Sequence, residues 1–201
     1  MFFAAYEDAA NVLVWSLYEL SRHPHVEEKL FREVDQVLDQ HQLDFERLQK
    51  LAYASQIVDE TLRLYPPTWS LLRDVRQDEQ IRGYPIPRGA IVILNIYLLH
   101  RHPQFWADPE TFDPGRFSAE KAALTRKPTY IPFGSGWRKC IGYALALTQM
   151  RVNLALIARK YRVVPLPDEE VKAEIDSSLR VAGGLPVHIF PRHHPGLSLQ
   201  A

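Results

Sequence analysis

Apolar residues recur every three or four positions through most of the first 64 residues, which is the spacing of helices that bury one face. The pattern predicts helices over residues 1–23, 24–40 and 52–64, the last of which ends before a pair of prolines. Asp44 is positioned to cap a short helix between the second and third of these. The second helix shows the clearest apolar face, formed by Val26, Leu30, Val34, Val37 and Leu38.

Beyond residue 65 this spacing gives way to short extended pieces separated by glycine and proline. Residues 90–98 predict a β-branched strand, and residues 143–161 return to the helical spacing. Residues 102–142 have little periodicity, but they carry many large aromatic side chains. A long segment of this kind predicts a packed, functional loop rather than disorder.

Near the C-terminal end, two extended runs, residues 179–182 and 185–190, stand on either side of Gly183-Gly184. Two runs joined by a pair of glycines predict a β-hairpin. The sequence contains no repeat and no obvious linker. The expected fold is therefore one domain over residues 1–201, mainly α with small β-sheets (α+β).

The first residues already belong to a helical pattern, with no capping residue ahead of them. We therefore expect a fragment that lacks a preceding N-terminal half. Glu7 and Asp8 interrupt the opening apolar run, which argues against both a secretory signal and a membrane span in this helix.

Composition is that of a folded globular protein, because 46% of the 201 residues are apolar and 24% are charged. A single cysteine excludes a disulfide scaffold. The net charge of zero gives no reason to expect nucleic acid as a partner. The charge is unevenly distributed, however: residues 1–60 carry a net charge of −7, residues 61–160 a net charge of +8, and the remainder a net charge of −1. Either these are two solvated faces, or an anionic ligand binds near the cysteine in the basic segment.

The cysteine, Cys140, lies in a glycine-rich segment just ahead of a predicted helix. A lone cysteine is most often a small buried hydrophobe. Here the positive end of the helix, with Arg138 and Lys139, favours the thiolate instead. No other cysteine or histidine stands at zinc-site spacing, so the pattern indicates a single-thiolate site. Nucleophile chemistry is an alternative, although no histidine has a recognisable pairing position.

The ten residues from Phe133 to Gly142, Phe-Gly-Ser-Gly-Trp-Arg-Lys-Cys-Ile-Gly, resemble the cysteine-ligand loop of the cytochrome P-450 superfamily at every defined position. The resemblance implies the C-terminal part of that fold and haem (iron protoporphyrin IX) as the cofactor. It implies that Cys140 is the thiolate ligand of the iron, and that Phe133, Gly134 and Arg138 contact the haem, with Arg138 on a propionate.

Two further motifs agree with this resemblance. Glu60-Thr-Leu-Arg63 resembles the Glu-x-x-Arg motif of the family, and the segment around Arg116 resembles its Pro-Glu-Arg-Phe element. The resemblance implies that Glu60, Arg63 and Arg116 form a structural cluster that holds the cysteine loop. It also implies that Arg73 and His100 bind haem propionates.

The first helix resembles the distal helix of the family, whose usual form is Ala-Gly-x-Glu/Asp-Thr-Thr. Glu7 provides the acid, whereas Asp8 stands where the family has an alcohol that assists proton delivery. We expect Glu7 and Asp8 to be the catalytic proton relay. The resemblance places the following residues around the substrate: Ala4, Ala5, Thr68, Leu72, Ser178 and Leu179.

The function implied by the resemblance is that of a haem-thiolate monooxygenase. Such an oxidoreductase inserts one atom of dioxygen into a small organic substrate and takes electrons from a ferredoxin, a flavodoxin or a reductase. Two alternatives stay open: a haem-thiolate isomerase or dehydratase acting on peroxides, and an inactive fragment that does not retain haem. The expected location is the cytoplasm for a bacterial source, with anchoring through a missing N-terminus also open.

Overall fold

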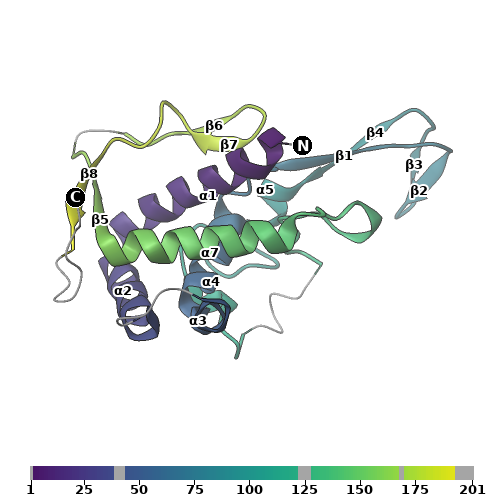
Figure 1. Cartoon of the computed structure of the whole chain (residues 1–201). Coiled ribbons are helices and arrows are strands. Elements are labelled where there is room, and N and C mark those ends of the chain that lie inside the picture. Colours follow the sequence, from purple (N-terminus) through teal and green to yellow (C-terminus); the bar gives the residue numbers. More distant parts are fainter. Residues whose placement is uncertain (1, 39–43, 122–127, 168–169, 193–201) are drawn as a thin grey trace.

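A computed structural model describes residues 2–38, 44–121, 128–167 and 170–192. Its core lies between helices α1 (Phe2–Arg22), α2 (Pro24–Leu38), α4 (Ala52–Leu64) and α7 (Tyr143–Lys160). In Figure 1, α1 and α7 run side by side above α2 and α4, and α7 packs against all three other helices. The side chains at the centre of the core are at most 1% exposed: Val12, Leu30, Val34, Leu38, Ile57, Val58, Leu154 and Ala155.

The helices begin and end where the local sequence dictates. α2 starts at Pro24, and α3 (Phe45–Lys50) is capped by Asp44, which accepts the Arg47 amide at 2.8 Å. α4 is capped from another helix: Glu33 of α2 accepts the amides of Tyr53 at 2.6 Å and Ala54 at 2.9 Å. The helix over 52–64 is thus confirmed. The second helix ends at Leu38, and residues 39–40 lie outside the described residues.

The strands of the described residues form two-stranded antiparallel sheets at the ends of the helical core (Figure 1). The four pairs are β1 (Ser70–Asp74) with β4 (Ile91–Asn95), β2 (Glu79–Ile81) with β3 (Tyr84–Ile86), β5 (Tyr161–Pro165) with β8 (Val187–Pro191), and β6 (Ala173–Ile175) with β7 (Leu179–Val181). The mixture of helices and small sheets is the α+β class expected from the sequence.

The predicted hairpin over residues 179–190 is wrong. β7 pairs with β6, the strand before it in the sequence, and β8 pairs with β5. The two extended runs therefore belong to different sheets. Gly183 and Gly184 both have positive φ, but they carry the chain from one sheet to the next. The bond from the Leu166 amide to the Pro186 carbonyl extends the β5–β8 pairing. Pairing with a strand distant in the sequence is thus favoured here over a hairpin closed by the two glycines.

The strand expected over residues 90–98 is shorter than predicted. β4 ends at Asn95, whose side chain accepts the Leu98 amide at 2.9 Å. Asn95 thereby caps a short helix, α5 (Ile96–Leu99), which stops the strand.

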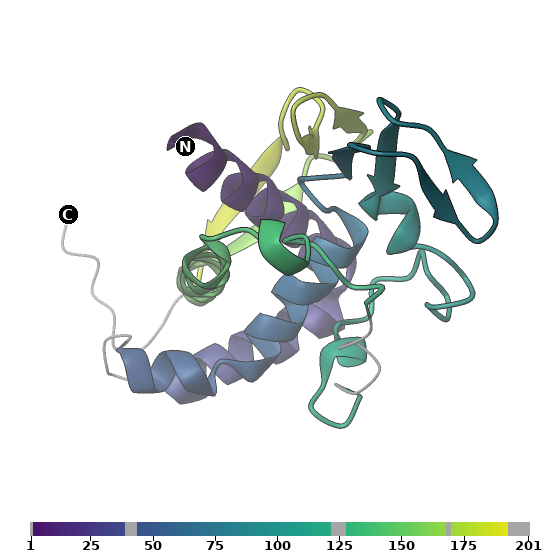
Figure 2. The ribbon, with the colours of Figure 1, turned by 90° about the vertical axis from the view of Figure 1, so that its right-hand side faces the viewer.

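The aperiodic stretch before α7 is folded around aromatic contacts. Trp106 is 6% exposed and lies near Phe117 and Tyr130, whose ring centroids are 4.9 Å apart. The described part of the stretch contains the short 3-10 helices η1 (Pro114–Phe117) and η2 (Gly136–Arg138). Figure 2 shows this chain passing between α7, seen end-on, and the β1–β4 sheet. Among the described residues, no helix is both long and apolar enough to cross a membrane.

Candidate active site

A cavity of about 380 Å³ lies between α1, the segment after α4, β1 and the start of α7. Its walls are mainly apolar, with Leu62, Pro67 and Phe133 among them. The chemically active side chains at its wall are Asp8, Thr68, Arg138 and Cys140. The structure therefore brings Asp8 and Cys140, which are 132 positions apart in the sequence, to one apolar cavity.

Cys140 reaches the cavity at the end of a loop that backbone bonds close. The Cys140 amide donates to the Phe133 carbonyl at 2.9 Å. Gly134 has φ +71°, and a Cβ there would lie 3.5 Å from Leu71 and 3.6 Å from the Arg138 carbonyl. The thiol is exposed at the cavity wall, two residues before the N-cap Gly142 of α7. Gly142 makes no side-chain cap bond, so the first amides of α7 are without a cap close in sequence to the thiol.

The residues around this cavity fit a haem. Arg138 lines the cavity, and the described residues offer its guanidinium no hydrogen-bond or ion-pair partner. Arg73 of β1 donates to the adjacent Leu72 carbonyl at 2.8 Å and does not line this cavity. One thiol, one cation and apolar walls suit a flat apolar ring that carries carboxylates. The described residues contain no group of three or more His, Cys, Asp or Glu that could hold a metal ion.

Asp8 extends from α1 to the cavity wall, beside Ala9. Burial raises the pKa of Asp8, and the charge of Glu7 raises it further. Glu7 is half-buried and does not line the cavity. Asp8, and not Glu7, is therefore the carboxyl at the wall of this cavity.

The residues expected around the substrate divide into two groups. Thr68 lines the cavity. Leu72 is 60% exposed instead, because the alternation of β1 turns Leu71 towards the cavity. Ser178 and Leu179 are 3% and 1% exposed and do not line it either.

Ala4 and Ala5 belong to the backbone of α1, but their side chains lie outside the described part of the chain. The cavity residues that the sequence did not indicate include Leu145 and Gln149. Leu145 and Gln149 are four apart in α7, so their helical spacing was the available signal.

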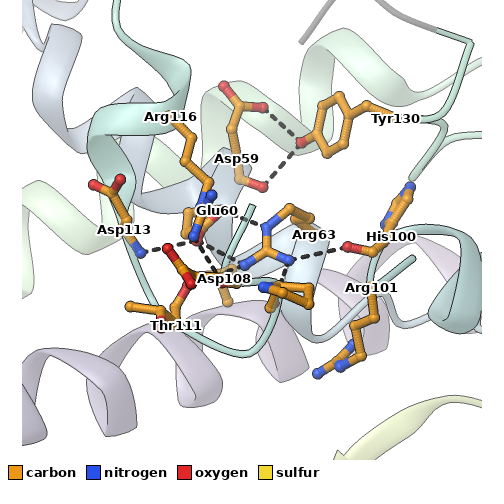
Figure 3. A network of polar contacts seen from close by, with 12 residues as sticks. Asp59, Glu60, Arg63, His100, Arg101, Asp108, Thr111, Asp113, Arg116 and Tyr130 are labelled. Carbon is orange, nitrogen blue, oxygen red and sulfur yellow. Dashed lines mark hydrogen bonds and ion pairs between the residues drawn. The ribbon is translucent and has the colours of Figure 1, made fainter. Parts of the chain in front are cut away.

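The three residues of the expected structural cluster are in contact beside the loop (Figure 3). Arg63 binds Glu60 through two nearly parallel bonds, Nε to Oε2 at 2.7 Å and Nη2 to Oε1 at 2.8 Å. Arg116 Nε lies 3.3 Å from Glu60 Oε1, and the Asp113 amide donates to the same oxygen at 2.8 Å. Burial raises the pKa of Glu60, whereas the bonds and charge of Arg63 act against that shift.

Arg63 also holds the chain that follows α5. Its Nη1 donates to the carbonyls of His100 at 3.0 Å and Pro109 at 2.7 Å, and its Nη2 donates to that of Thr111 at 3.1 Å. Arg116 donates to the Asp108 carbonyl at 2.8 Å. The cluster therefore joins α4 to the aperiodic stretch, as Figure 3 shows.

His100 lies in this cluster and does not line the cavity. The side chain is fully buried, and its Nε2 accepts the Ile131 amide at 3.0 Å. Burial lowers the pKa of His100 to about 3, so the ring is neutral and carries its proton on Nδ1. A neutral imidazole in this place cannot neutralise a propionate.

Beside this cluster, the buried tyrosine Tyr130 bonds to the carboxyl group of Asp59. Tyr130 donates to Asp59 Oδ1 at 2.9 Å and lies 3.0 Å from the Asp59 carbonyl. Burial raises the pKa of Asp59 to about 6, although the bond from Tyr130 lowers it. Because Ile131 follows Tyr130, this pair anchors the start of the cysteine loop to α4.

Comparisons with known proteins agree on one family. Residues 1–186 match the family described as cytochrome P450. Thromboxane-A synthase of Sus scrofa is 37% identical over 193 residues, which is 94% of this chain and 36% of the relative. Cytochrome P450 4F5 of Rattus norvegicus is 36% identical over the same shares of both chains.

A bacterial relative is also similar. Cyclooctat-9-en-7-ol 5-monooxygenase of Streptomyces melanosporofaciens is 35% identical over 164 residues, which is 82% of this chain and 36% of the relative. The chain spans about a third of the length of the curated relatives it matches.

Proposed function

The chain belongs to the cytochrome P450 family, and from this premise we propose that it forms the haem-binding part of a haem-thiolate monooxygenase. The observation that supports this most is the cavity that Cys140 and Arg138 share with Asp8. We further propose that residues 1–201 belong to one domain, the C-terminal portion of the family fold. Helices α1 and α7 share one core, which favours a single unit.

Cys140 would hold the iron through its thiolate, and the guanidinium of Arg138 would bind a propionate. Arg73 would bind the other propionate once it exchanges the Leu72 carbonyl for a carboxylate. Phe133 and Gly134 line the same cavity and would contact the ring. When bound, haem iron with a thiolate ligand supplies the activation of dioxygen by two electrons.

The thiol is positioned through an unbroken series of bonds from the buried cluster. Arg63 holds the His100 carbonyl, and the His100 ring holds the Ile131 amide. The Ile131 carbonyl accepts the Gly134 amide at 2.9 Å, and the Phe133 carbonyl accepts that of Cys140. The fixed cluster thereby determines where the loop presents its sulfur.

Asp8 would hold and release a proton at the cavity side of α1. Its raised pKa keeps the carboxyl closer to the pH at which a general acid works best. The apolar side chains of Ala9 and Leu71 line the same cavity. The substrate of such a site is a small organic molecule, and its electrons would come from a ferredoxin, a flavodoxin or a reductase.

A second candidate is a haem-thiolate isomerase or dehydratase acting on peroxides. The position that holds an alcohol in the usual family pattern is Asp8 here, and such chemistry needs no delivery of protons to dioxygen. An inactive fragment that does not retain haem is the third candidate.

Turnover distinguishes these candidates. Purified chain reconstituted with haem is supplied either with dioxygen and a reductase system, or with an organic hydroperoxide and no electron donor. The proposed function predicts oxygenated product only with the electron donor. Rearrangement of the hydroperoxide alone would support the isomerase, and failure to hold haem would support the inactive fragment.

A further inference from the structure

A second cavity, of about 380 Å³, borders the cysteine loop. Residues 130–135 form one wall of this cavity, and Asp59 of α4 belongs to another. Residues 132–134 line both this cavity and the one that contains Cys140. The same stretch of loop therefore contacts the cavity of the thiol and the cavity of the Asp59 carboxyl.

The hydroxyl of Tyr130 has two acceptors of α4 within reach (Figure 3). It lies 2.9 Å from Asp59 Oδ1 and 3.0 Å from the Asp59 carbonyl oxygen. A hydroxyl carries a single hydrogen, so it donates to Oδ1 when the carboxyl is ionised. When the carboxyl is protonated, it can donate to the hydroxyl oxygen instead, and the hydroxyl then donates to the carbonyl oxygen. Protonation of Asp59 therefore allows both short contacts to be hydrogen bonds.

The charged and titratable groups around Asp59 come from α4, the cysteine loop and α7. They are Glu60, Arg63, Tyr130, Lys139, Tyr143 and Arg151. Histidine, the side chain that ordinarily titrates between pH 5 and 8, is not among them. His100 holds the Ile131 amide of the loop, but burial lowers its pKa to about 3, so its ring stays neutral in this range.

Burial couples the proton of Asp59 to the place of the loop. Burial is the largest influence on the pKa of Asp59 and raises it from the usual 3.8 to about 6, against the bond from Tyr130 and the charge of Arg151. Because residues 130–135 cover the carboxyl, docking of the loop favours the protonated form, and by linkage protonation favours the docked loop. This contribution is present at low pH and is lost as pH rises through about 6.

We propose that Asp59 is a positioning residue for the cysteine loop, which in its protonated form fixes Tyr130 against α4 and on losing its proton loosens the segment that presents Cys140. The inference rests on the proposed function, because the loop acts through the thiol that would hold the iron. The Cys140 amide is bonded to the Phe133 carbonyl, so a shift of the cavity wall reaches the thiol directly. The site thereby responds to pH through a group that does not touch substrate or haem.

The first test is hydrogen exchange of the Gly134 and Cys140 amides in the purified chain at pH 5, 6 and 7, which needs neither haem nor turnover. Protection factors remove the intrinsic effect of pH on exchange. Between pH 5 and pH 7 they should fall by up to about tenfold, the change that linkage gives for pKa values of 3.8 and about 6. Asp59→Asn should abolish the fall, because a neutral amide can donate to the Tyr130 hydroxyl at every pH. Tyr130→Phe should move the fall to higher pH, because its bond favours the ionised carboxyl.

Glu28→Gln is the matched control, since Glu28 is an exposed carboxyl of α2, and it should leave the profile of the loop unchanged. The Leu154 amide of the buried core reports opening of the whole fold in the same samples. Constant protection of the loop, with a fall at Leu154 alone, would overturn the proposal because the proton would then act only on global unfolding. An equal fall in Asp59→Asn, or protection that rises with pH, would also overturn it.

The second test uses the carbon-monoxide spectrum of the reduced, haem-loaded chain. At pH 7 the share of the thiolate-type spectrum should be larger in Asp59→Asn than in the unaltered chain, because the neutral side chain keeps the loop docked. Equal shares would overturn the link between Asp59 and the thiol. A chain that holds no haem would refute the proposed function, whereas the exchange profile decides the role of Asp59 in either case. The two failures are therefore distinguishable.

Discussion

Glu60 and Arg63 face each other one turn apart in α4, with neither side chain exposed and Nε 2.7 Å from Oε2. Isolated pairs at this spacing contribute little at a protein surface. Here the pair is completed by Arg116, the Asp113 amide and three backbone carbonyls, so nearly every donor and acceptor has a partner. Removal of one member leaves a buried charge without compensation.

Glu60→Ala should therefore lower the free energy of unfolding by about 3–5 kcal/mol. Urea denaturation followed by circular dichroism measures the change. Glu28→Ala is the control, since Glu28 pairs with Arg32 at 2.9 Å on an exposed face. Its loss should stay within about 0.5 kcal/mol. Equal losses for the two variants would contradict the role assigned to the cluster.

Glu33 caps α4 from α2, and its removal should destabilise the chain by about 1–2 kcal/mol. Both freed amides, those of Tyr53 and Ala54, lie at a helix start that has no side-chain cap of its own. Denaturation of Glu33→Ala measures the loss, and Glu33→Gln should recover part of it because an amide oxygen accepts one of the two bonds. An unchanged midpoint for Glu33→Ala would show that solvent replaces the cap.

Asp59 should make stability depend on pH. Its pKa is raised from the usual 3.8 to about 6 by burial, so the folded state binds the proton more tightly than the unfolded state. The resulting stability is fully present below pH about 4 and is lost as pH rises towards 6. Asp59→Asn should remove this dependence, as measured by denaturation at pH 4, 5, 6 and 7. A decline of the same size in the variant would assign it to another group.

Tyr130→Phe tests the cause of that shift. The bond from Tyr130 lowers the pKa of Asp59, so its removal should move the decline in stability to higher pH. The same denaturation series detects this movement.

Asp8 should govern how electrons are used. If its carboxyl delivers protons, Asp8→Asn should slow turnover roughly 10²–10⁴-fold and divert electrons to peroxide. Asp8→Thr restores the hydroxyl that the family pattern has at this place, and it should retain coupling. Product formed per reduced nicotinamide consumed measures the effect in the haem-loaded protein. Equal coupling in the three proteins would remove Asp8 from the reaction.

The sequence predicted best those features that depend on neighbouring residues. The helix over residues 52–64 and the Asp44 cap follow from local spacing and local bonds, and the structure contains both. The cysteine loop is equally local, because ten consecutive residues define its motif. Glu60 and Arg63 are three apart, so one helical turn places them together.

Features that depend on distant partners could not be read in this way. The phase of β1, which turns Leu71 and not Leu72 to the cavity, is set by its pairing with β4. Strand β8 pairs with β5, which precedes it by more than twenty residues, and not with its neighbour β7. His100 carried no sign of burial in its own segment, because its contacts come from Arg63 and Ile131.

The account depends above all on Cys140 as the ligand of a haem iron, and the carbon-monoxide difference spectrum of the reduced, haem-loaded chain tests it most directly. The account predicts a thiolate-type spectrum in the unaltered chain and its loss in Cys140→Ser. Haem content is determined in the same samples, so that loss of the signature is separated from loss of the cofactor. An identical spectrum in the two proteins would contradict the assignment of Cys140.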